Sequence, residues 1–342
     1  MPDCGTPPEE AIHNRPLLLT ESLNLSFRKR DSRIEILSDI DIKIDRSEVF
    51  GLAGESGCGK SMTALSIMRL LPRMTHLAGK IGFYRKDRQE YTDLLNLRES
   101  EMIDIRGREI GMIFQEPMTS LNPVFSVGSQ ISETLTTHLG LSKREARERS
   151  IELLRLVKIP LPEHRVRDYP HQISGGMRQR IMIAMAVACN PSLLIADEPT
   201  TALDVTIQSE IIRLLLDIKK RSDMAILFIS HDLALISEMA DRVAVMYAGR
   251  IVEVAGSEAL FSGPAHPYTI GLLESLPSAR HERLKPIPGN VPSPGELPEG
   301  CKFSPRCSYS INDCKITEPD LREAGEAHLV RCFRTEEIGK WR

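Results

Sequence analysis

The stretch VFGLAGESGCGKS, residues 49–61, decides the fold. Its first five residues are apolar, as a buried parallel strand requires, and GESGCGKS at 54–61 fits the pattern G-x-x-x-x-G-K-[ST]. A helical run follows, so the pattern stands in the strand–loop–helix context that it needs. Glycines let backbone N–H groups curl around a phosphate, and the start of a helix adds positive potential. The stretch predicts a phosphate-binding loop, and the alternative is a glycine-rich turn that binds nothing.

Two acidic residues, Asp197 and Glu198, complete the residues expected at a nucleoside triphosphate site. In such a loop Lys60 reaches the β- and γ-phosphates and Ser61 holds Mg²⁺. The stretch LLIADEP places Asp197 and Glu198 at the carboxyl end of a buried strand, where ligands bind in open α/β sheets. We expect Asp197 to support the magnesium and Glu198 to polarise the attacking water as general base. Alternatively, the two acids only cap the next helix.

Short apolar runs recur along the chain between helical patterns. They lie at 49–53, 110–114, 193–197 and 225–229. Residues 205–221 place their apolar side chains at helical spacing on one face. This alternation predicts an α/β fold with a mostly parallel sheet over residues 16–276. Residues 142–158 predict a surface helix inside a helical insertion between about 116 and 173.

Composition limits the classes of protein. The chain has 342 residues, 41% of them hydrophobic, and a net charge of −3, which gives no reason to expect a nucleic-acid partner. The first 15 residues are polar, are expected to be disordered and contain no apolar core of an export signal. No apolar run approaches the roughly 20 residues that cross a bilayer, so we expect membrane association only through partners.

After Pro277 the chain becomes rich in proline and glycine, and residues 277–342 predict a small C-terminal domain with a core separate from that of the nucleotide site. Its four cysteines read C-x5-C-x6-C-x17-C, at Cys301, Cys307, Cys314 and Cys332. Zinc sites favour closer pairs, and the wide spacing suits an iron–sulfur cluster, with zinc or free thiols as alternatives. Of the other cysteines, Cys58 is expected near solvent as a small spacer open to oxidation, and Cys189 as a small buried side chain on a helix.

The sequence ISGGMRQR, 173–180, resembles the signature motif of ABC ATPases, although Met177 stands where that family commonly has glutamine. Other motifs of the family follow in order: Gln115 matches the Q-loop, Ala202, Leu203 and Asp204 match the D-loop, and His231 matches the switch histidine. Phe27 lies where the family has an aromatic that stacks on adenine, or it is a core phenylalanine. The resemblance implies that Glu198, His231 and Gln115 are catalytic and that Ser61, Gln115 and Asp197 hold Mg²⁺.

The same resemblance implies which residues contact ATP. Those of the chain's own site are Phe27, Gly54, Glu55, Ser56, Gly57, Cys58, Gly59, Lys60, Ser61, Met62, Gln115 and Asp197. Ser174, Gly175, Gly176 and Asp204 are expected to contact the ATP held by a second ATPase subunit, which we expect to be a paralogue. In this family the two subunits pair head to tail, so one chain with one set of motifs is insufficient.

Three stretches resemble the ATPase subunits of dipeptide and oligopeptide importers, a branch that also handles nickel. They are FQEPMTSLNP (114–123), HPYTIGLL (266–273) and PGNVPSPGELPEGCKFSPRC (288–307). The resemblance implies two integral membrane permease subunits that dock near residues 116–140, an extracytoplasmic solute-binding protein as an indirect partner, and a place on the cytoplasmic face of the inner membrane. Some members carry a 4Fe–4S cluster on matching cysteines, which implies the same for Cys301, Cys307, Cys314 and Cys332.

A different class is a soluble ABC-type ATPase of DNA repair or translation. Repair ATPases of this kind separate their halves with long coiled coils, but only 136 residues lie between Lys60 and Asp197. Translation-type members usually carry two cassettes, and this chain has one set of motifs. A basic stripe for nucleic acid is also missing from the sequence. The sequence therefore favours the transporter subunit.

Overall fold

The computed structural model describes residues 15–29, 32–86, 88–115, 120–201, 204–276 and 286–338. The disorder expected for residues 1–15 falls, apart from Arg15, outside these ranges. Ala202 and Leu203 of the expected D-loop also lie outside them. None of the helices in the described ranges is both long and apolar enough to cross a bilayer.

The centre of the molecule is a sheet of eight strands in the order β11-β12-β10-β9-β3-β8-β7-β6. Five neighbouring strands are parallel: β9 (Arg242–Tyr247), β3 (Val49–Ala53), β8 (Ala225–Ser230), β7 (Leu193–Asp197) and β6 (Ile110–Ile113). Four of these are the apolar runs that the sequence pointed to, and the predicted α/β class with a parallel sheet is confirmed. The remaining three strands pair antiparallel at one edge: β10 (Arg250–Gly256), β11 (Arg322–Gly325) and β12 (His328–Val330).

Side chains of the parallel strands alternate between two buried clusters. In β8, Ile226 and Phe228 belong to one cluster, whereas Leu227 and Ile229 belong to the other. The strands are therefore apolar on both faces, which explains their uninterrupted apolar sequences. The first cluster packs against the helices that follow the strands, among them α9 (Val205–Ser222) and α10 (Leu233–Met239).

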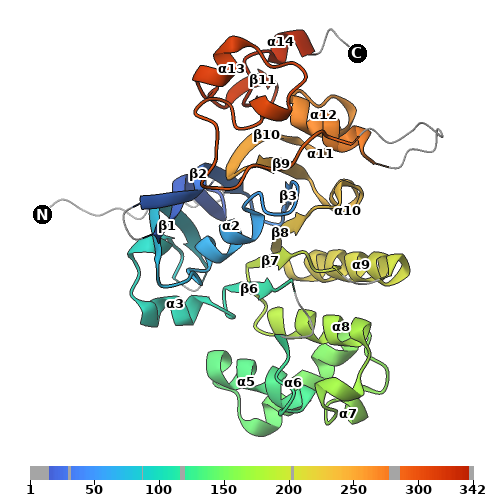
Figure 1. Ribbon diagram of the computed structural model, residues 1–342. Helices are drawn as coiled ribbons and strands as arrows, with labels where there is room; N and C mark the ends of the chain where they lie inside the picture. Colours follow the sequence, from blue (N-terminus) through green and yellow to red (C-terminus); the bar gives the residue numbers. More distant parts are fainter. Residues whose placement is uncertain are drawn as a thin grey trace, which may run out of the picture.

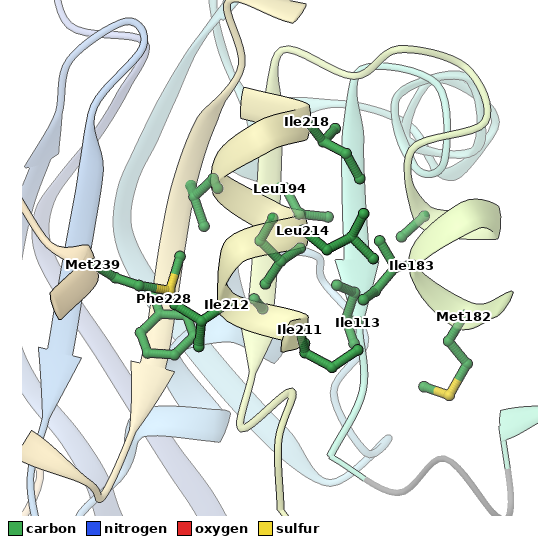
Figure 2. Packing of buried hydrophobic residues seen from close by; sticks show 14 of the residues in the cluster. Ile113, Met182, Ile183, Leu194, Ile211, Ile212, Leu214, Ile218, Phe228 and Met239 are labelled. Carbon is green, nitrogen blue, oxygen red and sulfur yellow. The ribbon is translucent and has the colours of Figure 1, made fainter. Parts of the chain in front are cut away.

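Helix α9 shows how one face is covered. In Figure 2, Ile212 lies beside Phe228 and Ile211 beside Ile113 of the sheet, and Leu214 and Ile218 belong to the same buried cluster. These positions recur at helical spacing, as the sequence predicted for residues 205–221. Asp204 caps the first turn, because its carboxylate accepts from the backbone N–H of Ile207 at 3.0 Å.

The other face of the central sheet packs against a second, antiparallel sheet. Its order is β2-β1-β4-β5, formed by β1 (Leu18–Lys29), β2 (Ser32–Ile44), β4 (Thr75–Arg85) and β5 (Glu90–Asp93). Buried residues of β1 and β2, such as Leu25 and Leu37, share a cluster with Phe50 and Leu52 of β3. Two helices and a short turn complete this side: α2 (Lys60–Ile67), η1 (Leu94–Asn96) and α3 (Glu99–Ile105).

A helical region leaves the central sheet after β6 and returns to it at β7 (Figure 1). It contains α5 (Val127–Leu139), α6 (Lys143–Leu156), α7 (Pro162–Arg165), the short turn η2 (Pro170–Gln172) and α8 (Gly175–Ala186). Helix α6 starts at a capping box, in which Ser142 and Glu145 bond to each other's backbone N–H groups. It matches the surface helix predicted over 142–158.

The C-terminal region joins the central sheet. Its elements are α11 (Ser257–Ser262), α12 (Pro267–Glu274), η3 (Ser304–Arg306), α13 (Asn312–Ile316) and α14 (Thr335–Ile338), together with β11 and β12. Strand β12 pairs with β10, so it extends the same sheet that carries the parallel strands. Phe303 belongs to the buried cluster that contains Leu194 and Phe228. The expectation of a separate C-terminal core is therefore wrong: a segment so poor in large apolar residues is stabilised by packing on the larger core.

Candidate functional site

Four of the expected site segments follow four adjacent parallel strands. The glycine loop follows β3, His231 follows β8, Glu198 follows β7, and Gln115 lies two residues after β6. Because parallel strands end at one edge, the sheet itself brings these segments together. Ser56, Lys60, Gln115 and Glu198 line one cavity of about 200 Å³ at this edge.

Positive backbone angles shape the glycine loop. Gly54 and Gly59 have φ of 149° and 112°, a region that other residues rarely adopt. A Cβ on Gly54 would lie 2.3 Å from the carbonyl oxygen of Met246, and one on Gly59 would lie 2.8 Å from Leu37. The loop therefore lies against β9 and β2 and leads directly into helix α2, whose N-terminus adds positive potential.

Lys60 places its charge inside the loop. Its ammonium donates to the backbone carbonyls of Gly54 at 2.8 Å and Glu55 at 3.0 Å, and the residue is only 4% exposed. A buried cation inside a glycine loop at the start of a helix is suited to a bound polyphosphate. Ser61 and Met62 line the same cavity. The loop residues at this site thus fit the triphosphate of a nucleotide.

Ser61 and Asp197 form a pair of oxygen donors. The Ser61 hydroxyl donates to a carboxylate oxygen of Asp197 at 3.0 Å. Burial raises the pKa of Asp197, and the hydrogen bond from Ser61 opposes this shift. Hydroxyl and carboxylate oxygens are the ligands that Mg²⁺ prefers. A divalent cation would also offset the burial of this carboxylate, so the pair fits a magnesium ion.

Glu198 is held by three side chains. Gln115 Nε2 lies 3.1 Å from its carboxylate, the Thr201 hydroxyl donates to it at 2.8 Å, and His231 Nδ1 lies 3.1 Å away. Burial raises the pKa of Glu198, but its other contacts, chief among them the hydrogen bonds from His231 and Thr201, together lower it by more than burial raises it. The net shift is therefore downward, and the carboxylate is ionised at neutral pH. The backbone of Glu198 has φ of 45°, which for a residue other than glycine indicates strain at a functional position.

The structure also shows side chains that sequence reasoning missed. Thr201 was not predicted, although its place three residues after Glu198 suits a local hydrogen bond. Ile36 of β2 lines the cavity, whereas Phe27, half-buried on β1 and paired with Ile34 and Thr75, is not one of the described residues that line it. No sequence motif marked Ile36, because it is one of several alternating apolar residues on its strand.

Two cysteine predictions need correction. Cys58 is buried and belongs to the core beneath the loop, with burial raising the pKa of its thiol, so it is not open to solvent as expected. The positive angles of the neighbouring glycines turn the loop so that Cys58 points inward. Cys189 lies beyond the end of α8 rather than on it and is half-buried; burial raises the pKa of its thiol to about 11.

Ser174 of the signature and Asp204, the described residue of the expected D-loop, each lie at the start of a helix. Ser174 caps α8, because its hydroxyl accepts from the backbone N–H of Met177 at 3.4 Å. A Cβ on Gly175 would meet nothing within 4 Å, so the start of α8 is open. Ser174 and Asp204 are both exposed. Neither is among the described residues that line the cavity holding Lys60, so the chain leaves them free to meet another surface.

The four C-terminal cysteines line one small cavity. Cys301, Cys307, Cys314 and Cys332 surround it together with Phe303 and Arg334. All four are free thiols, and burial raises the pKa of Cys301 to about 12 and that of Cys307 to about 11. Within the described ranges, no group of three or more His, Cys, Asp or Glu residues is arranged so that it could hold a metal ion. The structure therefore places the four cysteines around one cavity, but the described residues show no arrangement there that could hold a metal ion.

Comparison with known proteins agrees with this geometry. Residues 37–201 match the family described as "ABC transporter", and residues 252–314 match "Oligopeptide/dipeptide transporter, C-terminal region". The chain is 47% identical to the oligopeptide transport ATP-binding protein AppD of Bacillus subtilis (strain 168), over 94% of this chain and 98% of AppD. It is 46% identical to the dipeptide transport ATP-binding protein DppD of Haemophilus influenzae, over 92% of this chain and 94% of DppD.

A solved structure shares the fold. The dimeric ATP-binding cassette MJ0796, in a post-hydrolysis state bound to ADP and Pi, superposes with a TM-score of 0.61 at 25% identity, over 70% of this chain and 98% of the cassette. The nucleotide site and the sheet define a P-loop ATPase of the cassette type. The chain belongs to the family of ABC transporter ATP-binding subunits.

Glu198→Gln tests the role of the carboxylate. The amide keeps the shape and can still accept from Thr201, but it cannot take a proton, so steady-state ATP hydrolysis should fall by about 10²-fold or more while ATP binding is kept. Turnover and nucleotide affinity are measured on the same preparation. The exposed Glu258 of α11 provides the control, because Glu258→Gln changes an equivalent group far from the cavity. Turnover of Glu198→Gln within about twofold of the unchanged protein would exclude the role.

Proposed function

We propose that the chain is the ATP-hydrolysing subunit that powers import of dipeptides or oligopeptides through a membrane permease. The observation that carries this is similarity along nearly the whole chain, including the C-terminal region, to AppD and DppD, whose names describe oligopeptide and dipeptide transport. The assembled nucleotide cavity supplies the ATPase part of the proposal.

In the proposed mechanism the loop 54–62 binds the phosphates of ATP. Lys60 stabilises the charge at the β- and γ-phosphates, while Ser61, Asp197 and Gln115 would hold Mg²⁺, which would supply positive charge beside the phosphates. Glu198 accepts a proton from the attacking water, because its carboxylate is ionised and lies at the cavity wall. His231 and Gln115 orient that carboxylate at the distances observed here.

The exposed helix starts supply the second half of a composite site. We propose that Ser174, Gly175, Gly176 and Asp204 of this chain contact the ATP held by a second ATPase subunit, with the two subunits head to tail. The observations in support are the exposure of Ser174 and Asp204 and the dimeric state of MJ0796. An open helix N-terminus is suited to the γ-phosphate of the partner's nucleotide.

Pairs of variants test the head-to-tail geometry. One mixed dimer combines Ser174→Arg on this chain with loss of the P-loop lysine on the second subunit. Both changes should damage the ATP site of the second subunit, so the site at Lys60 of this chain should still cleave ATP. With Ser174→Arg and Lys60→Ala on one chain, both sites should be damaged. Single-turnover ATP cleavage measures the difference. The opposite pattern would show that Ser174 serves its own Lys60. Ser142→Arg, at the exposed cap of α6, is the control.

An apolar cavity beside the site fits the permease. It measures about 320 Å³, and its lining includes Phe114, which directly follows β6, and Met182 and Met185 of α8. Val124 and Phe125 follow Ser120, one of the residues that line this cavity, by four and five positions. Their side chains are 74% and 54% exposed. Exposed apolar side chains of this kind mark interaction surfaces. We propose that helices of the two permease subunits dock here, which would place the chain at the cytoplasmic face of the membrane.

Phe125→Asp tests the docking surface. A carboxylate in an apolar interface is costly, so co-purification with the two permease subunits and uptake of labelled peptide should fall by about tenfold, while ATP binding stays unchanged. Ile316→Asp is the control, because Ile316 is 72% exposed but lies in the C-terminal region. Absence of any polytopic membrane partner would favour a soluble ATPase, and uptake of nickel instead of peptide would correct the solute.

We propose that the four cysteines hold a 4Fe–4S cluster. Thiolates are its usual ligands, and all four thiols already surround one cavity. The cavity volume is about 10 Å³, so loading requires the cysteine loop to move outward and the thiols to lose protons. Zinc and free thiols are the competing outcomes.

Anaerobic purification tests the cluster. We expect about four iron atoms and four acid-labile sulfides per chain, with broad visible absorbance. Cys301→Ser should lose both, whereas Cys189→Ser should keep them, because Cys189 lies outside this cavity. Stoichiometric zinc without sulfide, or no metal in anaerobic protein, would exclude the cluster.

A further inference from the structure

Every polar group of Glu55, the second residue of the glycine loop, is held. Its carbonyl accepts from Lys60 at 3.0 Å, and its backbone N–H donates to the hydroxyl of Tyr268 at 2.9 Å. Its carboxylate accepts two hydrogen bonds from the guanidinium of Arg306, at 2.7 and 3.1 Å. Tyr268 and Arg306 both belong to the C-terminal region, and Arg306 lies 251 residues from Glu55.

Arg306 is held in position by contacts other than the one with Glu55. It is only 8% exposed, its Nε donates to the carbonyl of Pro288 at 2.8 Å, and its guanidinium lies 5.8 Å from the ring centre of Tyr247. A planar guanidinium that bonds a carboxylate with two N–H groups is a geometrically specific contact. The pair therefore sets the position of the Glu55 side chain rather than following it.

Tyr268 is equally constrained. Its ring packs edge-on against Tyr247 at 4.7 Å and lies 5.4 Å from Phe303. Helix α12 begins at Pro267, and at its N-cap His266 Nδ1 accepts from the backbone N–H of Tyr268. A buried aromatic cluster of this kind presents the hydroxyl at a defined point. The HPYT stretch thus contacts the glycine loop directly.

The charge of Glu55 gives the contact a consequence for nucleotide binding. Its carboxylate lies one residue from Gly54, in a loop suited to a polyphosphate anion. Without a partner it would repel that anion and could move toward Lys60, whose ammonium already touches the Glu55 carbonyl. Arg306 neutralises this carboxylate and turns it toward the C-terminal region.

We propose that Arg306, supported by Tyr268, is a positioning residue for the nucleotide site of its own chain. By neutralising and orienting Glu55, it keeps the glycine loop in the shape that accepts the phosphates of ATP. This inference rests on the proposed assignment of residues 54–62 as the phosphate-binding loop. It gives the C-terminal region a part in ATP binding, whether or not its cysteines hold a metal.

The test is the equilibrium affinity of the full-length chain for MgATP. Arg306→Gln leaves the Glu55 carboxylate unpaired, so we expect about tenfold weaker binding of MgATP and a smaller loss for MgADP, which carries less negative charge. Adding Glu55→Gln to Arg306→Gln removes the unpaired charge and should recover most of the lost affinity. Recovery in the double variant would trace the lost affinity to the unpaired Glu55 carboxylate and not to the absence of the Arg306 side chain itself.

Controls separate folding from charge. Arg322→Gln, in an exposed pair with Asp320 on the same region, should leave MgATP affinity unchanged. Arg306→Lys keeps the positive charge and should bind MgATP more tightly than Arg306→Gln. If Arg306→Gln does not fold, Tyr268→Phe, which keeps the ring and removes only the acceptor of the Glu55 N–H, should still weaken binding several-fold.

Three results would overturn the inference. The first is an MgATP affinity of Arg306→Gln within about twofold of that of the unchanged protein, and the second is a double variant that binds MgATP no better than Arg306→Gln. The third, which applies if Arg306→Gln does not fold, is an MgATP affinity of Tyr268→Phe equal to that of the unchanged protein. Lys60→Ala distinguishes failure of the role inferred for Arg306 from failure of the assignment of residues 54–62 as the phosphate-binding loop. If Lys60→Ala weakens MgATP binding and Arg306→Gln does not, the inference alone fails. If Lys60→Ala has no effect, the assignment of the nucleotide site itself fails.

Discussion

The constraint on which the rest of the structure depends is burial of the parallel strands on both faces. Strands β3, β8, β7 and β6 alternate their side chains between two apolar clusters, so they have no polar face and can meet solvent only at their ends. Polar residues supplied by these strands must therefore lie at strand ends, and in open α/β sheets ligands bind at the carboxyl ends. The glycine loop, His231, Glu198 and Gln115 all obey this rule, which is why residues far apart in sequence line or border one cavity.

Much of this could be predicted from the sequence because both signals are local. An apolar run of four or five residues marks a buried strand, and a polar residue directly after it marks the functional edge, as at Asp197 and Glu198. Helix α9 was predicted because Ile211, Leu214 and Ile218 repeat at helical spacing. The glycine loop was predicted because its positive φ angles restrict which residues fit.

What sequence reasoning missed depends on contacts between distant segments. Arg306 lies in a stretch rich in proline and glycine, and no periodicity shows that its guanidinium reaches Glu55. The inward turn of Cys58 follows from loop angles that a motif does not encode. Ile36 lines the cavity only because β2 passes beside the glycine loop, where a Cβ on Gly59 would touch Leu37. These are tertiary contacts between distant segments, and the local pattern of a single sequence does not indicate them.

The C-terminal region links two sites that the sequence suggested were independent. It has few large apolar residues, so it gains stability by adding β12 to the sheet and Phe303 to the central core. The same short loop carries Cys301, Phe303, Arg306 and Cys307, and these contact the cysteine cavity, the core and the glycine loop in turn. Outward movement of this loop to accept the proposed cluster would carry Arg306 with it, because Arg306 lies next to Cys307. Under that proposal, cluster loading at the cysteines and nucleotide binding at the glycine loop would share this loop, and each would change the free energy of the other by the same amount.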